Sequence, residues 1–258
     1  MNRLICDGES AATVDFFDQS AEDYYRSYQE NSPGGYALRV RREKVLKLFD
    51  QPGGKVVDVG CGPAVMTQAM LERGCSFWGV DPSPRMIEIS RKLFQENERV
   101  HFLSGDAMRM DFPDGQFDAV LCMGVIDALH DRHQAVREML RVLKPGGTLI
   151  VSFTNLSSPY SWWKLYVFYP VVSVLKRIRQ DLWAHMKKRV LFTERAAHQL
   201  LTSEGARITE SVGYYYIPLD EIWPWGALWV TQRLEESRCQ RLRWLAAGWI
   251  VKARKPSQ

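Results

Sequence analysis

The fold is decided by residues 56–67, which read Val-Val-Asp-Val-Gly-Cys-Gly-Pro-Ala-Val-Met-Thr. Three β-branched residues, Val56, Val57 and Val59, predict a short strand covered on both faces. Gly60 and Gly62 then end the strand, and glycine at both positions permits a sharp turn and a close approach of a ligand to the backbone. The first amides of the following helix would point at that ligand. The stretch predicts a small-molecule site, but a Gly-x-Gly turn after a strand also occurs where nothing binds.

Strands and helices alternate along the chain after this turn. Further strands are predicted at 76–80, 100–103, 117–121, 148–153, 206–216 and 248–253, with helices at 64–71, 86–94 and 135–143 and a sharp turn at 144–147. Such alternation predicts an α/β, Rossmann-like fold with a mainly parallel seven-stranded sheet and helices on both faces. Ligands of such sheets bind at the carboxyl ends of the strands, where Gly60, Asp81, Asp106 and Met123 fall.

Asp81 is the second candidate for ligand binding. It lies 21 residues beyond Gly60, about the spacing at which a carboxylate after the second strand accepts both ribose hydroxyls of a nucleoside. The alternative is that Asp81 caps the next helix, but Ser83 can supply that cap instead. We therefore predict that Asp81 binds a ribose.

Composition and charge favour an ordinary globular protein. The 258 residues are 46% hydrophobic and 25% charged, which suits one α/β domain with an embellishment. The net charge of +4 comes without the basic groove of a nucleic-acid protein, so no nucleic-acid partner is predicted. Five scattered cysteines lack paired metal spacing and indicate a reducing compartment and no metal. With neither a secretory signal nor an apolar run of about 20 residues, we expect a cytoplasmic protein.

Aromatic residues cluster near both ends of the chain. Residues 13–36 predict a helix or two, ended by a Ser-Pro-Gly-Gly turn, which could cap a pocket or simply pack on the domain; a further helix follows at 38–49. Of nine tryptophans, only Trp78 precedes residue 160. Residues 156–192 combine Trp and Tyr with seven Lys or Arg and one acid, Asp181. This segment could be a lid over an acceptor pocket, a contact with an anionic membrane surface, or both.

Four regions follow from these patterns. We predict an N-terminal helical cap at 1–50, a cofactor-binding Rossmann-like core at 51–155, an aromatic and basic insertion after the fifth strand at 156–192, and the C-terminal part of the core with a substrate-side cover at 193–258.

Five motifs, in order, resemble those of class I S-adenosylmethionine-dependent methyltransferases, in particular the small-molecule group that includes the ubiquinone and menaquinone methyltransferases. The resemblance covers about residues 56–152. The motifs are Val-Asp-Val-Gly-Cys-Gly at 57–62, Val-Asp-Pro-Ser-Pro-Arg-Met at 80–86, Ser-Gly-Asp-Ala at 104–107, Phe-Asp-Ala-Val-Leu-Cys-Met-Gly-Val at 117–125 and Arg-Val-Leu-Lys-Pro-Gly-Gly-Thr-Leu at 141–149.

The resemblance implies the class I methyltransferase fold, S-adenosyl-L-methionine as cofactor, and a role for each matching residue. Asp58 and the two glycines would line the methionine end, and Asp81 would hold the ribose hydroxyls. Met86 would pack near the adenine, and Asp106 would accept a hydrogen bond from its amino group, assisted by the Ala107 backbone. The predicted cofactor site comprises Asp58, Gly60, Cys61, Gly62, Asp81, Pro82, Met86, Asp106, Ala107 and Met123.

Methyl transfer requires mainly that donor and acceptor be held in line. If the acceptor is a hydroxyl, a base helps, and the loop after the fourth strand offers Asp127, His130 and His133, of which we select His130, with Asp127 second. Many relatives carry histidine or glutamate-histidine where Asp127 and Ala128 stand, and His130 could equally be a structural imidazole. The predicted acceptor is a hydrophobic small molecule such as a quinone, polyketide or other aromatic metabolite, methylated at oxygen or carbon.

Two other functions stay open at this point. A nucleotide-dependent oxidoreductase would want a third glycine, whereas Pro63, Ala64 and Val65 follow Gly62. A catalytically inactive, cofactor-binding partner subunit is the second alternative, because methyl transfer leaves little catalytic signature in a sequence.

Overall fold

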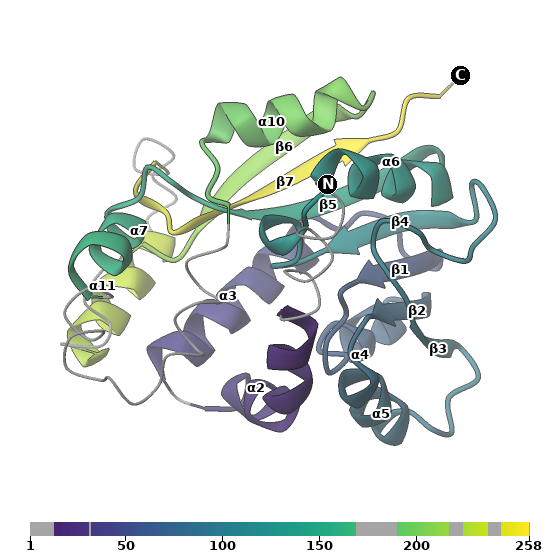
Figure 1. The fold of residues 1–258 in the computed structure, drawn as a ribbon, viewed down its shortest axis with the longest axis horizontal. Coiled ribbons are helices and arrows are strands. Elements are labelled where there is room, and N and C mark those ends of the chain that lie inside the picture. Colours follow the sequence, from purple (N-terminus) through teal and green to yellow (C-terminus); the bar gives the residue numbers. More distant parts are fainter. Residues whose placement is uncertain (1–12, 31, 169–189, 217–223, 237–243, 258) are drawn as a thin grey trace, which may run out of the picture.

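The computed structural model describes residues 13–30, 32–168, 190–216, 224–236 and 244–257 of the chain. Its centre is a seven-stranded sheet in the order β3-β2-β1-β4-β5-β7-β6 (Figure 1). The strands are β1 (Lys55–Val59), β2 (Ser76–Asp81), β3 (Val100–Ser104), β4 (Phe117–Cys122), β5 (Leu143–Thr154), β6 (Arg207–Tyr214) and β7 (Gly248–Arg254).

The strand pairing places the loops that matter for binding. Strands β1 to β5 pair in parallel, and β7 runs antiparallel to both β5 and β6. The chain proceeds outward from β1 through β2 to β3 and then resumes on the other side of β1 with β4. The order therefore reverses between β1 and β4, which is the point where ligands of open α/β sheets bind.

Helices cover both faces of the sheet (Figure 1). One face packs on α6 (Arg132–Val142) and α10 (Glu194–Ser203), in a buried cluster that contains Met139 and Leu201. The other face packs on α3 (Pro33–Leu48), α4 (Thr67–Glu72) and α5 (Pro84–Leu93), in a cluster that contains Val45, Met70 and Ile87. The remaining elements are α2 (Ala21–Ser27), η1 (Ile126–Ala128), α7 (Pro159–Trp163), η2 (Lys164–Phe168) and α11 (Pro224–Glu236). The predicted α/β sheet with two helical layers is confirmed.

Two predicted turns are wrong. The Ser-Pro-Gly-Gly stretch does not end a helix but begins α3, because the Ser32 side chain accepts a hydrogen bond from the Gly35 amide and Pro33 occupies the first helical position. A serine cap followed by proline starts a helix rather than stopping one. Similarly, residues 144–147 do not form a separate turn before β5 but belong to that strand. The register of β5 against β4 shifts there, between Phe117 and Ala119 of β4.

The helix predicted at 64–71 begins later, at Thr67. The preceding residues form turns after residues 60–62, which we call the glycine loop, and Ala64 has a positive φ of 59°. Among the residues that the structure describes, no helix combines the length and the hydropathy that a membrane crossing would need.

Candidate active site

A cavity of about 530 Å³ opens at the carboxyl edge of the sheet, beside the reversal between β1 and β4. The loops after β1, β2, β3 and β4 all contribute to its wall, as does the N-terminal segment. Eight of the ten predicted cofactor residues line it: Gly60, Gly62, Asp81, Pro82, Met86, Asp106, Ala107 and Met123. The other two, Asp58 and Cys61, are buried behind the glycine loop and are not among the lining residues.

The glycine loop is pressed against the loop after β4. Gly60 has a φ of 70°, and a Cβ atom built on it would lie 2.1 Å from Cγ2 of Val125. The Gly60 amide donates to the carbonyl of Val80 at 2.7 Å, which joins the loop to β2 as well. Only a residue without a side chain fits between these neighbours, so the two loops meet at the wall of the cavity through Gly60.

Asp81 joins the glycine loop to the start of α5. Its carboxylate accepts hydrogen bonds from the backbone amides of Gly62 and Ser83, each at 2.9 Å. The helix cap is supplied by Ser83, whose hydroxyl accepts from the Met86 amide, so the prediction that Ser83 can act as the cap is confirmed. Burial raises the pKa of Asp81 above its usual value, against the two backbone hydrogen bonds. Beyond these two amides, the part of the chain that the structure describes leaves acceptor positions of the carboxylate that could bind ribose hydroxyls.

The loop after β3 places a carboxylate on the wall of the cavity. Asp106 is exposed, and one of its oxygens accepts from the Met108 amide at 2.9 Å, which fixes the turn. Ala107 beside it is buried, and Met86 of α5 is 2% exposed. An exposed acceptor beside apolar side chains suits a flat heteroaromatic ring with an amino group.

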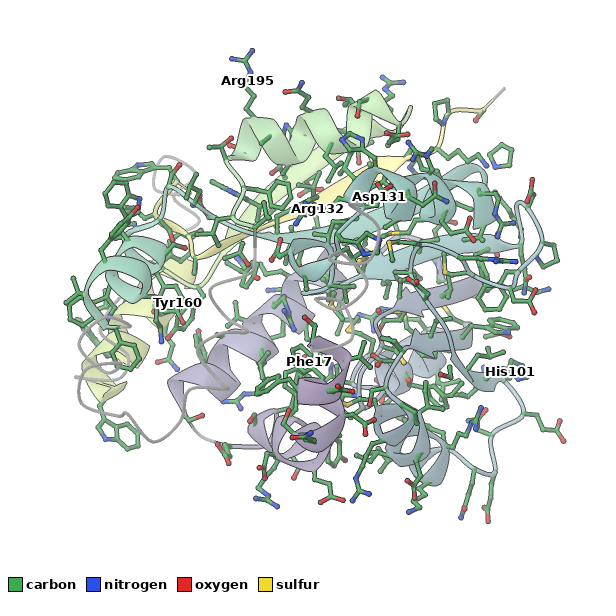
Figure 2. The ribbon with its side chains drawn as sticks, in the orientation of Figure 1. Phe17, His101, Asp131, Arg132, Tyr160 and Arg195 are labelled. Carbon is green, nitrogen blue, oxygen red and sulfur yellow. The ribbon has the colours of Figure 1, made fainter. Side chains whose placement is uncertain are left out.

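The N-terminal segment closes the cavity from outside the sheet. Residues 13–19 are helical, and Phe17 and Tyr24 from this segment and α2 are among the lining residues. The carboxylate of Asp18 accepts from the Ser83 hydroxyl at 2.6 Å and the Arg85 amide at 3.0 Å, so the segment is fastened to the start of α5, next to Asp81. Figure 2 shows Phe17 in the middle of the molecule, between α3 and the sheet. The sequence signalled this cap only through its aromatic content.

A buried charge cluster lies behind the glycine loop. Arg41 of α3 is 9% exposed, donates to the Tyr28 hydroxyl at 3.1 Å, and lies so close to Gly124 that a Cβ there would be 2.6 Å from its Nη1. Asp58 is 1% exposed, and neither of its carboxylate oxygens has a hydrogen-bond partner among the described residues. Burial raises the pKa of Asp58 to about 8, although Arg41 acts in the opposite direction. The sequence pattern predicts a helix at Arg41 but not its contact with Gly124.

The raised pKa of Asp58 predicts a pH dependence of stability. Between about pH 4 and pH 8 the folded state holds a proton that the unfolded state has lost, so the free energy of unfolding falls as pH rises through this range. The Asp58→Asn variant resembles the neutral acid and should lack this part of the slope. Thermal melts of both proteins without cofactor, from pH 5 to pH 8.5, measure the difference. Parallel curves, or a variant that is less stable at pH 8, would show that Asp58 is ionised beside Arg41.

The two predicted catalytic residues lie outside the cavity wall. Asp127 is 2% exposed, and its carboxylate accepts hydrogen bonds from the backbone amide and the hydroxyl of Thr154, which anchors η1 to the end of β5. His130 is exposed at the bend before α6. From the same loop, Ala128 and Leu129 line the cavity instead. The role of His130 or Asp127 as a base stays a prediction.

Comparison with known proteins shows what the middle of this chain is similar to. Residues 57–151 match the family model described as a methyltransferase domain. The demethylmenaquinone methyltransferase of Lysinibacillus sphaericus is 32% identical over 132 residues, 50% of this chain and 56% of that protein. The ubiquinone biosynthesis O-methyltransferase of Xanthomonas campestris is 33% identical over 121 residues, 45% of this chain and 49% of that protein. The chain thus spans about half the length of the curated relatives it matches.

Solved structures share the fold over most of the chain. The 1,6-didemethyltoxoflavin-N1-methyltransferase of Burkholderia thailandensis, solved with its substrate and S-adenosylhomocysteine, superposes with a TM-score of 0.62 at 17% identity over 98% of this chain and 91% of that one. An S-adenosylmethionine-dependent methyltransferase of Aquifex aeolicus gives a TM-score of 0.57 at 15% identity, over 90% and 97%. At such identities the likeness shows the fold alone. Neither an oxidoreductase nor an inactive partner is supported by these matches.

The residues present fit the cofactor of this family. Gly62 has space beside it, since a Cβ would lie no closer than 3.7 Å to Tyr24, and the acceptors Asp81 and Asp106 stand on the wall of the same cavity. Residues 57–151 are therefore a methyltransferase domain with the class I, S-adenosylmethionine-dependent fold.

Proposed function

We propose that this protein transfers a methyl group from S-adenosylmethionine to a hydrophobic small molecule. The observation that carries the proposal is the composition of the cavity wall. Polar and small residues that suit the cofactor, namely Gly60, Gly62, Asp81 and Asp106, share the cavity with apolar side chains from the loop after β4 and the N-terminal segment. The apolar lining residues of these two segments are Val14, Phe17, Met123, Val125, Ala128 and Leu129.

The proposed roles follow from the positions of the side chains. When bound, S-adenosylmethionine supplies a methyl group on a positively charged sulfur. Asp81 would hold the ribose through its free acceptor positions, and Asp106 with the Ala107 backbone would bind the adenine. The buried guanidinium of Arg41, next to Gly124, would favour the carboxylate of the methionine end. The carboxyl group of Asp58 is buried near this methionine end and would interact with the ammonium group of the methionine.

The chain's main contribution to the reaction would be alignment and exclusion of water. The contact of Gly60 with Val125 fixes the two loops that would bound donor and acceptor. The Asp127 hydrogen bonds to Thr154 hold η1 in place, so that Leu129 faces the cavity. Asp127 is therefore proposed as a positioning residue for this wall, in addition to its earlier interpretation as a base.

The proposed acceptor class rests on the apolar lining and on the relatives. The two relatives named above are, by their names, methyltransferases of menaquinone and ubiquinone synthesis. A quinone, hydroquinone or similar aromatic ring fits a wall of aliphatic and aromatic side chains. We also propose that an anionic membrane surface, where such acceptors dissolve, is a partner.

A general base at His130 has a testable consequence. If His130 removes the acceptor proton, His130→Gln should lower kcat by about a hundredfold while leaving cofactor affinity unchanged, since a positioned base contributes on the order of 10² to 10⁴ in rate. His133→Gln is the matched control, because His133 lies three residues further along the chain and its ring forms a hydrogen bond with Glu204 at 2.6 Å. Unchanged turnover in His130→Gln would assign the imidazole to the protein surface, where the structure places it.

The function itself is tested by product formation. The purified chain is incubated with S-adenosylmethionine that carries a labelled methyl group and with a panel of hydroquinones, catechols and soluble phenols. We expect label in an organic-soluble product of one acceptor class and formation of S-adenosylhomocysteine in equal amount. Tight cofactor binding without methyl transfer to any acceptor of this panel would favour the inactive partner subunit.

A further inference from the structure

The exposed aromatic side chains of this protein gather at one edge of the sheet. Every tryptophan that is exposed among the described residues follows β5 or β6 or precedes β7: Trp162, Trp225, Trp229 and Trp244. Because β5 and β6 both run antiparallel to β7, the ends of β5 and β6 and the start of β7 lie at the same edge. The parallel strands β1 and β4 end there too, so the aromatic residues share an edge with the cavity.

We define the aromatic edge as Trp162, Tyr166, Trp225, Trp229 and Trp244. Their exposed fractions are 58%, 67%, 70%, 60% and 54%, so each indole or phenol presents more than half its surface to solvent. Figure 1 shows α7 and α11 at the same end of the molecule, and Figure 2 places Tyr160 of α7 there, opposite His101 of β3. A cluster of exposed tryptophans is unusual on a soluble domain and marks an interaction surface.

The helices of this edge carry their apolar side chains outward. Trp225, Trp229 and Arg233 are four residues apart in turn and therefore share one side of α11. That side is exposed, whereas Thr231 is fully buried and α11 packs on α3. In α7 and η2, Trp162 and Tyr166 are likewise four residues apart, with ring centroids 5.2 Å apart. Surface helices of a globular protein usually show the reverse pattern.

Cations are interleaved with these rings. The ammonium group of Lys164 lies 5.1 Å and 5.0 Å from the ring centroids of Tyr160 and Phe168, and the guanidinium of Arg233 lies 5.8 Å from the ring of Trp229. The sequence contains no acid from residue 156 to residue 168, and the net charge of residues 156–192 is +6. Lys164 is the one charged residue of α7 and η2, and Arg233 lies on the exposed side of α11, so the cations that contact these rings favour an anionic occupant.

Amphipathic rings beside cations match the boundary of an anionic bilayer. Tryptophan and tyrosine place their rings at the level of the lipid headgroups, while lysine and arginine attract anionic phosphates. We propose that the aromatic edge docks this protein on an anionic phospholipid surface. The cavity then faces the layer in which a hydrophobic acceptor is dissolved. The inference deepens the proposed function by naming where its membrane partner binds, and it does not depend on methyl transfer.

The test uses vesicle flotation of the full chain without cofactor. Vesicles of phosphatidylcholine and phosphatidylglycerol in a ratio of about two to one are compared with pure phosphatidylcholine at low salt. We expect the protein to float with the anionic vesicles and to bind pure phosphatidylcholine about tenfold more weakly, with the difference shrinking in high salt as charges are screened. Protein that stays at the bottom of the gradient with anionic vesicles at low salt would overturn the proposal.

Variants locate the surface. Trp225→Ser with Trp229→Ser, and separately Trp162→Ser with Tyr166→Ser, should each weaken vesicle binding by about tenfold or more. Leu93→Ser is the matched control, because Leu93 is 45% exposed on α5, away from this edge, and should bind like the wild type. Melting temperature and S-adenosylhomocysteine affinity should stay at wild-type values, which separates this inference from the proposed function. Wild-type vesicle binding by both double variants, or a dimer of the wild type that they abolish, would contradict it.

Discussion

The Gly60→Ala variant should bind S-adenosylmethionine and S-adenosylhomocysteine about a hundredfold more weakly than the wild type, or not measurably. The added methyl group would lie 2.1 Å from Cγ2 of Val125, far inside van der Waals contact, and the branched Val125 side chain has few rotamers to which it can move. The φ of 70° adds a strain of roughly 1 to 2 kcal/mol for a residue with a side chain. Relief of the clash requires the loops after β1 and β4 to separate, which opens the wall that would cradle the cofactor.

Gly53→Ala is the control for backbone strain. Gly53 has a φ of 75°, close to that of Gly60, but a Cβ there meets no atom within 4 Å. This variant should lose about 1 kcal/mol of stability and keep full cofactor affinity. Calorimetric titration with S-adenosylhomocysteine compares the three proteins. Equal affinity in Gly60→Ala and the wild type would mean that the glycine loop does not form the binding wall.

Asp81→Asn should lower cofactor affinity by about a hundredfold with a smaller effect on stability. The carboxylate now accepts hydrogen bonds from the amides of Gly62 and Ser83, and an amide group in its place would turn an N–H toward one of them. The variant also removes the charged acceptor proposed for the ribose hydroxyls, and hydrogen bonds to charged groups are worth about 1.5 to 3 kcal/mol each. A hundredfold change in affinity is about 2.8 kcal/mol, which lies within the range for one such loss.

Asp118→Asn provides a matched comparison for Asp81. The Asp118 carboxylate also accepts a backbone amide hydrogen bond, from Lys55 at 2.8 Å, and pairs with Lys144 at 2.6 Å, but Asp118 is not among the residues that line the cavity. Its replacement should lower the melting temperature and leave S-adenosylhomocysteine affinity unchanged. If both variants lost affinity equally, the effect at Asp81 would reflect general destabilisation rather than ribose binding.

Sequence alone predicted the parts of the site that are built from local patterns. The strand that ends at Gly60, the position of Asp81 after β2 and the serine cap at Ser83 depend on residues a few positions apart, and all three occur in the structure. The five motifs fixed the order of the loops, and eight of the ten residues predicted from them line one cavity. The spacing of motifs along the chain is enough to predict the residues of a site when each strand contributes one loop to it.

Contacts between distant segments could not be predicted in this way. Val125 meets Gly60 across 65 positions, and Arg41 reaches Gly124 across 83, and neither partner carries a local sign of the other. The predicted base illustrates the same limit. The short helix η1 turns the chain so that Asp127 is buried against Thr154 and Leu129 faces the cavity, while His130 points outward. The conformation of that turn therefore decides which of these neighbouring side chains lines the cavity.

Composition predicted that aromatic residues are concentrated in the C-terminal part of the chain, but not where the aromatic edge lies. The excess of tryptophan after residue 160 was visible in the sequence, which left open a lid, a membrane contact or both. The structure adds that the described tryptophans Trp162, Trp225, Trp229 and Trp244 are exposed and lie at the cavity's edge of the sheet, which supports a contact surface.

The central claim is that the cavity beside Gly60 and Asp81 binds the methyl donor, and calorimetric titration of the purified chain with S-adenosylhomocysteine tests it most directly. We predict saturable binding with one site per chain, loss of that binding in Gly60→Ala, and its retention in Gly53→Ala. Titration with NAD in parallel tests the competing class of ligand. Absence of S-adenosylhomocysteine binding by a folded wild-type protein, or tighter binding of the dinucleotide, would contradict the account.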